Sequence, residues 1–285
     1  MKKILILGAS GMAGHVVYTF LNEKAKYELL GTTNSNNFQG NIVKLDIFNQ
    51  EDLLRIIDDF NPDIVVNCVG MLINGANKFP DKTIYANSYF PHLLQRLSSE
   101  KSFKLIHIST DCVFSGKKGG YEEKSFKDAT DTYGLSKSLG EIDDESNLTI
   151  RTSIIGPEIK QQGEGLFHWF MNQNDSVYGY KSNIWSGVTT LELAKFIEWV
   201  IENPLTGLCH LTNNDSISKF DLLQSFNTIF DKKLAISDAK DYACNKSFVN
   251  TNKAINYSVP TYTKMLEDQR EFMDAHHDFY VHYKE

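Results

Sequence analysis

A tyrosine and a lysine four residues apart, Tyr133 and Lys137, are the residues whose types and spacing most directly suggest chemistry. On a helix these positions share one face, so the ammonium can lie beside the phenol and favour its anionic form. Tyr133 is then a candidate proton donor near neutral pH. A surface tyrosine stacked on a lysine stem is the alternative, and position in the fold must decide between them.

Glycines near the start of the chain give this pair a context. Gly8, Gly11 and Gly14 follow an apolar run and precede a stretch with helical periodicity. Glycines at such a turn allow a tight bend and close approach of a pyrophosphate to bare backbone N–H groups. We expect a dinucleotide site here, with Ser10 and Met12 as further contacts, rather than a purely structural turn.

The pattern around these motifs predicts an α/β protein. Short apolar runs alternate with helical stretches, which is typical of a Rossmann-like, doubly wound parallel sheet with helices on both faces. The expected strands are residues 4–7, 28–33, 42–45, 64–67, 104–109 and 148–153, and the expected helices among them are residues 12–23, 50–60 and 84–99.

After Gly156 the pattern changes to shorter elements. We therefore divide the chain into a dinucleotide-binding domain, residues 1–156, and a smaller, mainly substrate-binding lobe, residues 157–285, interleaved with the first. Helices are expected in the second part at residues 191–201, 219–230 and 261–276.

Polar side chains end the fifth expected strand. Ser109, Thr110 and Asp111 lie at its carboxyl end, where open α/β sheets place their sites. Thr110 then lies on the element that precedes the helix of Tyr133 and Lys137. We expect a hydroxyl, a phenol and an ammonium to converge beside the nicotinamide.

The end of the second strand bears on the choice of cofactor. NAD enzymes usually place Asp or Glu there to hold the ribose 2′-hydroxyl, whereas this chain reads Gly31-Thr-Thr-Asn34-Ser-Asn. A 2′-phosphate meets no acid here and could be held by Thr32, Thr33, Asn34 and Ser35, although no arginine is present to pair with it. The sequence favours NADP(H), with NAD(H) as the alternative.

Composition excludes several other functions. The formal net charge is −7 and no run of lysine or arginine occurs, which argues against a nucleic-acid partner. No segment approaches the ~20 apolar residues of a membrane span. The four cysteines are scattered, so we expect a reducing cytoplasm and no disulfide framework. His276, His277 and His282 do not share a helix face, and no metal site is expected.

Taken together, the motifs resemble the extended short-chain dehydrogenase/reductase superfamily, and most closely its dTDP-4-dehydrorhamnose reductase family of nucleotide-sugar reductases. The resemblance covers nearly the whole chain. It rests on the G-x-x-G-x-x-G turn, Ser109-Thr-Asp-Cys-Val-Phe114, Tyr133-Gly-Leu-Ser-Lys137, Arg151-Thr-Ser153, His210-Leu-Thr212 and Ile217-Ser-Lys-Phe220.

This resemblance implies that a hydride passes from the nicotinamide to a ketone carbon while Tyr133 protonates the carbonyl oxygen. Thr110 would polarise that oxygen, and Lys137 would hold the ribose and lower the tyrosine pKa from its usual value near ~10. Asn87 matches a position that supports the lysine or a bridging water; a solvated polar residue on a helix is the alternative.

Two more cofactor contacts are implied. Asp46, after the third strand, would contact the adenine edge, with a helix N-terminal acid before Asn49 as the alternative. At the end of the fourth strand, the backbone of Cys68, Val69 and Gly70 would lie alongside the cofactor.

Departures from the family pattern bear on the substrate. The related 4,6-dehydratases carry Glu where this chain has Cys112, and a thiol cannot replace that carboxylate in dehydration. Rhamnose reductases tend to have an aromatic residue at position 112 and Trp at position 154, here Ile154. We expect Asp111, Cys112 and Ile154 to contact the substrate in an altered pocket. Another 4-keto-6-deoxy sugar, UDP-linked and N-acetylated, is as good a candidate as dTDP-4-dehydrorhamnose.

Aromatic residues after position 156 are further candidates for substrate contact. Phe167, Trp169 and Trp185 would lie on the sugar nucleotide, or instead form the core of the small lobe.

The leading hypothesis is thus a reductase of a nucleotide-diphosphate keto sugar that supplies a deoxy sugar for surface polysaccharide. The alternatives are a nucleotide-sugar epimerase with a permanently bound cofactor and a non-catalytic, NADP-binding regulatory subunit. A homodimer is left open.

Overall fold

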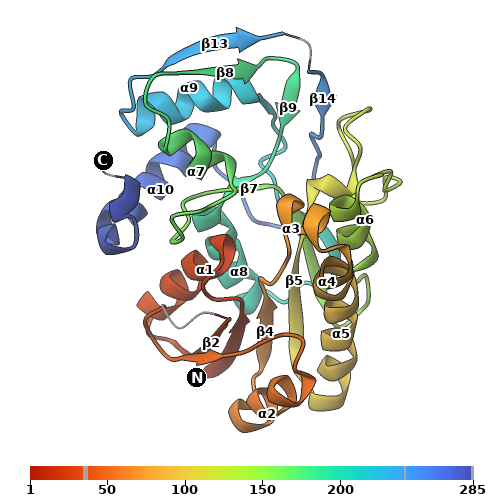
Figure 1. Ribbon diagram of the computed structural model, residues 1–285. Helices are drawn as coiled ribbons and strands as arrows, with labels where there is room; N and C mark the ends of the chain where they lie inside the picture. Colours follow the sequence, from red (N-terminus) through yellow and green to blue (C-terminus); the bar gives the residue numbers. More distant parts are fainter. Residues whose placement is uncertain (35–37, 241, 284–285) are drawn as a thin grey trace.

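The main sheet has seven parallel strands in the order β11-β6-β5-β4-β1-β2-β3 (Figure 1). The computed structural model describes residues 1–34, 38–240 and 242–283, so Ser35, a predicted contact of the 2′-phosphate, lies outside the described residues. The strands are β1 (Lys2–Leu7), β2 (Tyr27–Thr33), β3 (Ile42–Lys44), β4 (Ile64–Asn67), β5 (Lys104–Thr110), β6 (Leu148–Thr152) and β11 (Gly207–His210). The predicted Rossmann-like class is confirmed.

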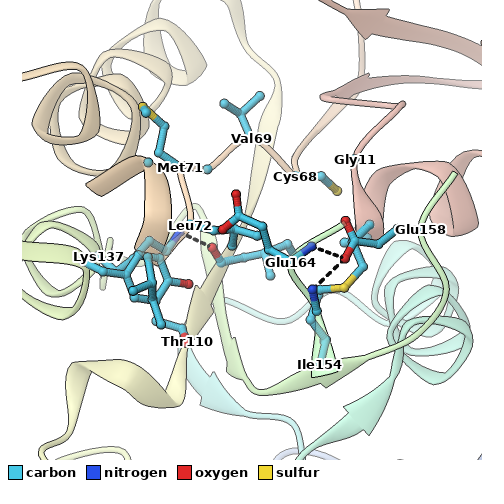
Figure 2. A pocket seen from close by; sticks show the side chains of 18 of the residues that line it. Gly11, Cys68, Val69, Met71, Leu72, Thr110, Lys137, Ile154, Glu158 and Glu164 are labelled. Carbon is cyan, nitrogen blue, oxygen red and sulfur yellow. Dashed lines mark hydrogen bonds between the residues drawn. The ribbon is translucent and has the colours of Figure 1, made fainter. Parts of the chain in front are cut away.

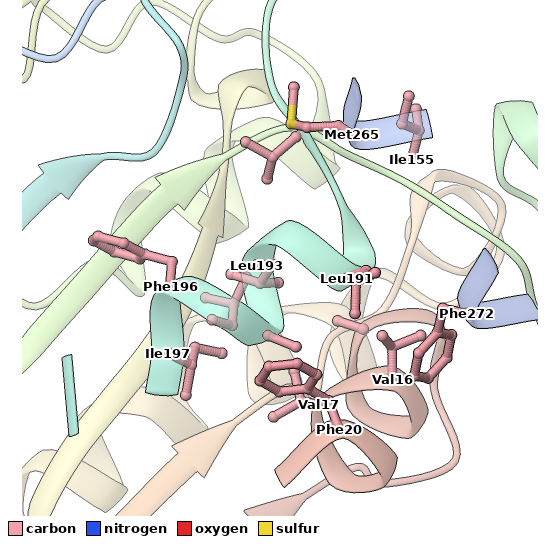
Figure 3. Close-up of a cluster of buried hydrophobic side chains, with 14 of the residues drawn as sticks. Val16, Val17, Phe20, Ile155, Leu191, Leu193, Phe196, Ile197, Met265 and Phe272 are labelled. Atoms are coloured by element: carbon pink, nitrogen blue, oxygen red, sulfur yellow. The ribbon is translucent and has the colours of Figure 1, made fainter. Parts of the chain in front are cut away.

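Alternation along the central strand β1 explains why the sheet is covered on both sides. Ile4 and Ile6 join one buried cluster, whereas Leu5 and Leu7 join another, because successive side chains of a strand point to opposite faces. One face is covered by α1 (Met12–Glu23) and α8 (Thr190–Glu202), and the other by α2 (Gln50–Phe60) and α5 (Phe90–Lys101). Figure 3 shows Val17 and Phe20 of α1 packed against α8.

The helix predicted over residues 84–99 is interrupted. The structure has α3 (Ile73–Lys78), α4 (Pro80–Ile84), a π-helical turn η1 (Tyr85–Tyr89) and then α5. Within the turn the Phe90 N–H bonds to the Tyr85 carbonyl, five residues back. Pro91 has no N–H to offer Asn87, which favours this local widening. Such turns often occur at functional sites.

A smaller lobe occupies the upper part of Figure 1. Its strands pair as β13-β8, β12-β9-β14 and β10-β7. Their bounds are β7 (Ile154–Ile155), β8 (Ser176–Tyr180), β9 (Asn183–Trp185), β10 (Val188–Thr189), β12 (Ile217–Ser218), β13 (Ala235–Ala239) and β14 (Cys244–Asn245). The helices are α7 (Leu166–Met171), α9 (Lys219–Ile229) and α10 (Tyr262–Ala275), followed by two short turns, η3 (His277–Phe279) and η4 (Val281–Tyr283).

The two parts are interleaved. Between elements of the small lobe the chain returns to the main sheet through α8 and β11, and β11 extends that sheet beyond β6. The sequence pattern did not predict β11 as a strand. No helix among the described residues has both the length and the apolar character needed to cross a membrane.

Candidate active site

The turn after β1 has the geometry of a phosphate-binding loop. Gly8 has φ +79°, a conformation that favours glycine. A Cβ on Gly14 would lie 2.1 Å from the Gly8 carbonyl oxygen, so only glycine lets α1 pack this closely on the turn. Gly11 caps α1, whose first N–H groups have no partner within the helix. The turn therefore fits the pyrophosphate of a dinucleotide.

A cavity of about 690 Å³ lies beside this turn (Figure 2). This volume is within the usual range for a small-molecule site. Its walls come from the turn after β1, the segment after β4, the end of β5, helix α6 (Thr132–Leu139) and residues 152–165. Predicted site residues that line it are Ser10, Gly11, Met12, Cys68, Val69, Gly70, Thr110, Asp111, Cys112, Tyr133, Lys137 and Ile154.

Tyr133 and Lys137 both lie on α6 and face the cavity. The Asp131 carboxylate begins this helix by accepting the Gly134 N–H at 2.9 Å. Lys137 donates from Nζ to the Ile108 carbonyl oxygen at 2.7 Å, which ties the helix to the end of β5. Burial lowers the pKa of Lys137 to about 8, against the nearby charge of Glu141.

The expected lowering of the Tyr133 pKa by Lys137 is not found. Burial is the largest influence on Tyr133 and raises its pKa, and Cys112 acts in the same direction, while a hydrogen bond with Thr110 opposes them. The protonated phenol is thus strongly favoured. The lysine ammonium is instead directed at the Ile108 carbonyl oxygen.

Thr110 is the second hydroxyl of the site. Its Oγ1 donates to the Asp111 carboxylate at 3.1 Å and accepts the Cys112 N–H at 3.2 Å. The hydroxyl is thereby held at the carboxyl end of β5, next to the Tyr133 phenol. Two hydroxyl groups on adjacent elements can both donate to one carbonyl oxygen.

Asn87, in the π-helical turn, is fully buried, so the alternative of a solvated residue is wrong. Its amide accepts the Met71 N–H at 2.9 Å and donates to the Met71 carbonyl at 3.0 Å and to the Ser136 hydroxyl at 3.1 Å. These bonds fix the segment after β4 and one turn of α6. Asn87 positions two walls of the cavity, and its bonds go to these groups rather than to Lys137.

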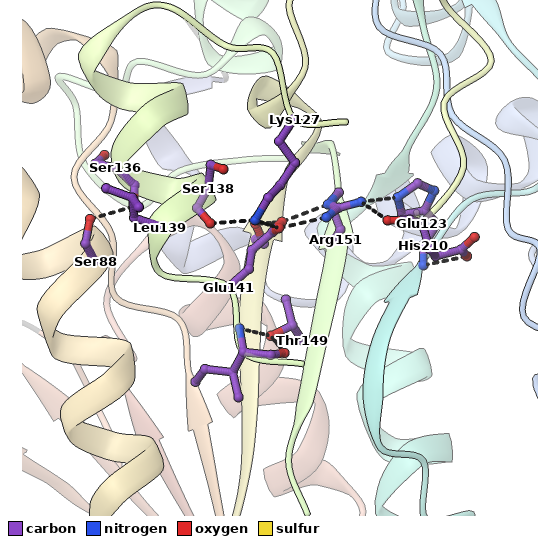
Figure 4. A network of polar contacts seen from close by, with 12 residues as sticks. Ser88, Glu123, Lys127, Ser136, Ser138, Leu139, Glu141, Thr149, Arg151 and His210 are labelled. Atoms are coloured by element: carbon purple, nitrogen blue, oxygen red, sulfur yellow. Dashed lines mark hydrogen bonds and ion pairs between the residues drawn. The ribbon is translucent and has the colours of Figure 1, made fainter. Parts of the chain in front are cut away.

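A buried polar network lies behind α6 (Figure 4). The Glu141 carboxylate accepts two hydrogen bonds from Arg151 at 2.7 Å and one from Ser109 at 2.7 Å. Lys127 pairs with the same carboxylate at 3.1 Å, and His210 lies 2.7 Å from Arg151 Nη1. Since Glu141 directly follows α6, the network anchors that helix to β5 and β6.

A strap, residues 158–165, closes one side of the cavity and was not predicted from the sequence. The Glu158 carboxylate accepts the N–H groups of Glu164 and Gly165 at 2.9 and 2.7 Å (Figure 2). A Cβ on Gly165 would lie 3.1 Å from the sulfur of Met12, so the strap packs on the start of α1. The Tyr283 hydroxyl accepts the Glu158 N–H at 3.0 Å and joins the strap to the C-terminal turn η4.

The residues expected to select the cofactor lie near the end of β2. Thr33 Oγ1 is 2.6 Å from Ser10 Oγ, and Thr32 Oγ1 accepts the Gly8 N–H at 3.3 Å. Asn34 is exposed and follows directly. Asp46 is also exposed, outside the cavity lining, and accepts the Phe48 N–H at 3.1 Å.

Comparison with known proteins places the chain in a family. The family model described as the RmlD substrate binding domain matches residues 1–246. The chain belongs to this family. The resemblance inferred from the motifs is thereby confirmed.

Individual curated relatives share less than a third of their aligned residues with this chain. The probable low-salt glycan biosynthesis reductase Agl14 of Haloferax volcanii is 29% identical over 140 residues, 48% of this chain and 46% of that protein, so the match spans about half of its length. Methionine adenosyltransferase 2 subunit beta of Xenopus tropicalis is 23% identical over 242 residues, 78% of this chain and 70% of that protein.

Among solved structures, dTDP-4-dehydrorhamnose reductase from Bacillus anthracis in complex with NADP has a TM-score of 0.81 at 22% identity. The superposition covers 96% of this chain and 100% of that one. At this identity the likeness shows the shared fold.

Three residues expected to contact substrate do not line the cavity of this family member. Phe167 is in the core of the small lobe, edge-on to Phe226 and Phe230. Trp185 is buried and donates its indole N–H to Ser153 at 2.8 Å, so it supports the cavity wall from behind. Trp169 is largely exposed on α7. The aromatic content of the sequence alone could not distinguish residues of the hydrophobic core from residues that contact substrate.

Proposed function

We propose that this chain is an NAD(P)H-dependent reductase of a nucleotide-linked 4-keto-6-deoxy sugar, either dTDP- or UDP-linked, in deoxy-sugar and surface polysaccharide biosynthesis. One observation carries the proposal: the hydroxyls of Thr110 and Tyr133 and the ammonium of Lys137 meet in one cavity beside a dinucleotide turn. This set suits reduction of a ketone.

The residues have separate tasks in this reaction. A bound nicotinamide cofactor would supply the hydride for the carbonyl carbon. Tyr133 donates its phenolic proton to the carbonyl oxygen, and the Thr110 hydroxyl, turned away from Asp111, donates a hydrogen bond to the same oxygen, which stabilises the developing negative charge. Because burial raises the pKa of Tyr133, the phenol holds its proton until the oxygen becomes basic. Lys137 would hold the ribose of the cofactor.

NADP(H) is the proposed cofactor, with NAD(H) as the alternative. Asn34 and Thr33 end β2 where an NAD site would have an acid, so a 2′-phosphate meets no negative charge there. The Bacillus anthracis structure of the same fold contains NADP, which supports this choice. The reductase of Haloferax volcanii supports a role in glycan biosynthesis.

A regulatory subunit is the second candidate, favoured by the match to methionine adenosyltransferase 2 subunit beta over 78% of this chain. The assembled set of Thr110, Tyr133 and Lys137 supports catalysis instead. An epimerase is the third candidate. Each makes a different prediction for cofactor consumption.

Absorbance at 340 nm, the band of reduced nicotinamide, separates the three. A reductase oxidises one NADPH for each 4-keto-6-deoxy sugar nucleotide consumed. An epimerase interconverts sugar nucleotides with no net change in absorbance. A regulatory subunit binds NADPH and turns over nothing. Absence of NADPH oxidation with both the dTDP- and the UDP-linked keto sugars would refute the proposal.

The proposal also covers the roles of the two parts of the chain, its cellular location and its oligomeric state. Residues 157–285 would mainly bind substrate and residues 1–156 mainly the dinucleotide. The four cysteines are free thiols, which supports a reducing, cytoplasmic location. A homodimer is left open.

A further inference from the structure

Two lysines in the small lobe, Lys219 and Lys246, form no ion pair with a carboxylate among the described residues. Lys219 follows β12, and Lys246 follows β14; these strands flank β9 on opposite sides. Neither lysine forms an ion pair within 4.0 Å in the described part of the chain, whereas Lys181 in the same lobe pairs with Asp238 at 3.2 Å. Burial lowers the pKa of Lys219 to about 8. A half-buried ammonium without a counter-ion suits an anionic ligand.

Both lysines directly follow strands that pair with β9. Ser218 of β12 and Asn245 of β14 both pair with Ile184 of β9, and β9 and β14 lie side by side in Figure 1. Lys246 follows β14 and donates its backbone N–H to the Ile184 carbonyl of β9 at 3.2 Å, and Lys219 is the first residue of α9, directly after Ser218. Lys219 Nζ lies 5.2 Å from the centre of the Trp185 ring.

The surroundings of the two lysines adjoin the cavity. The indole N–H of Trp185 bonds to Ser153, and Lys246 lies beside the thiol of Cys112; both Ser153 and Cys112 line the cavity. Neither Lys219 nor Lys246 lines the cavity itself: Lys246 borders Cys112, and Lys219 borders Trp185, which bonds to Ser153. We call this border the rim of the cavity.

The local charge is positive. Asp111 is the carboxylate whose charge acts on both lysines, alongside the thiols of Cys112 and Cys244. Burial raises the pKa of Cys112 to about 12, so this thiol is uncharged. Two ammonium groups face one carboxylate.

We propose that Lys219 and Lys246 bind the diphosphate of the nucleotide sugar whose keto group lies at Thr110 and Tyr133. The inference rests on the proposed function. A sugar that reaches Tyr133 fills the interior of the cavity, and its diphosphate must then extend to the rim. Two lysines suit the doubly charged diphosphate as point-charge contacts from both sides.

The test measures binding of UDP, dTDP, uridine and thymidine by calorimetry to the wild-type protein, Lys219→Met and Lys246→Met. Each variant should bind the nucleoside diphosphate about 10- to 100-fold more weakly, the range for a charge-assisted hydrogen bond. Nucleoside and NADPH affinities should change less than about 2-fold. Lys181→Met, which removes a lysine of the same lobe that has its own partner, should match the wild type.

The outcomes separate this inference from the proposed function. Variants that bind UDP or dTDP as tightly as the wild type would overturn the inference and leave the reductase proposal standing. Equal losses for nucleoside and diphosphate, or a parallel loss of NADPH affinity, would also overturn it, by showing pocket damage or a cofactor contact. A wild-type protein that binds neither diphosphate would contradict the proposed function itself.

Discussion

The buried carboxylate of Glu141 provides a sharp test of how α6 is held. In Glu141→Gln the side chain keeps its shape but loses its charge. Arg151 and Lys127 then face a neutral amide, and one of the two oxygens that accept from Arg151 becomes an NH₂ group. The side chains of Glu141 and Arg151 are each 2% exposed, so water cannot replace the lost partner.

The magnitude follows from this burial. Removing one partner of a buried ion pair costs about 3–5 kcal/mol of unfolding free energy, because the other charge is left uncompensated. At about 2 °C per kcal/mol for a chain of this size, the melting temperature should fall by roughly 6–10 °C. Glu100→Gln is the matched control, since Glu100 and Arg96 form an exposed pair 4.0 Å apart. It should cost less than about 0.5 kcal/mol.

Urea denaturation followed by circular dichroism measures the free energy of unfolding of both variants. The way in which this free energy changes with pH is a second test. Burial alone would raise the pKa of Glu141, but the hydrogen bonds and charges of Arg151 and Lys127 outweigh it and lower this pKa from its ordinary value of 4.5. The pair's contribution is therefore fully present above pH ~4.5 and is lost as pH falls through the lower folded-state pKa. Glu141→Gln should flatten this acid-side loss. A Glu141→Gln protein as stable as Glu100→Gln at pH 7 would refute the reasoning.

Three further predictions concern the cofactor end. NADPH affinity should weaken by about 10-fold as pH rises through about 8, because burial lowers the Lys137 pKa to that value and the neutral amine holds the ribose less well. The Lys137→Met protein should bind NADPH weakly at every pH. Calorimetry from pH 6.5 to 9.5 tests both expectations. Asn34→Asp should weaken NADPH binding relative to NADH binding, as measured by the ratio of their dissociation constants. An unchanged ratio would show that the 2′-phosphate does not lie beside Asn34. Gly14→Ala should cost about 1–3 kcal/mol of stability and weaken NADPH binding, because the new Cβ would lie 2.1 Å from a backbone oxygen. Unaltered NADPH binding would contradict the claim that the close packing at this turn forms the cofactor site.

Local signals in the sequence predicted the elements that carry the cofactor turn. The predicted bounds of α1 and α2 match the structure because the chain marks their ends. Asn49 caps α2 by accepting the Asp52 N–H, and Asn61 ends it in a left-handed conformation. Tyr133, Lys137 and Thr110 were placed together because the carboxyl ends of parallel strands meet at one edge.

Tertiary contacts determined what the sequence could not predict. The strap depends on Glu158 bonding to N–H groups six and seven residues away and on Tyr283, 125 residues along the chain. Pro91 favours the π-helical turn at Asn87, but the turn also packs closely on Gly140, the residue that ends α6. Several strands of the small lobe, such as β7 and β12, have two residues, too few for alternation to be visible.

Transfer of label from deuterated NADPH tests the central claim most directly. With cofactor that carries deuterium at both C4 positions of the nicotinamide and a nucleotide-linked 4-keto-6-deoxy sugar, the account predicts one deuterium at C4 of the product sugar for each NADPH oxidised. Tyr133→Phe should retain NADPH affinity and lower turnover by about 10²–10⁴-fold, since it removes the proton donor alone. Product without deuterium, or a Tyr133→Phe protein with wild-type turnover, would contradict the account.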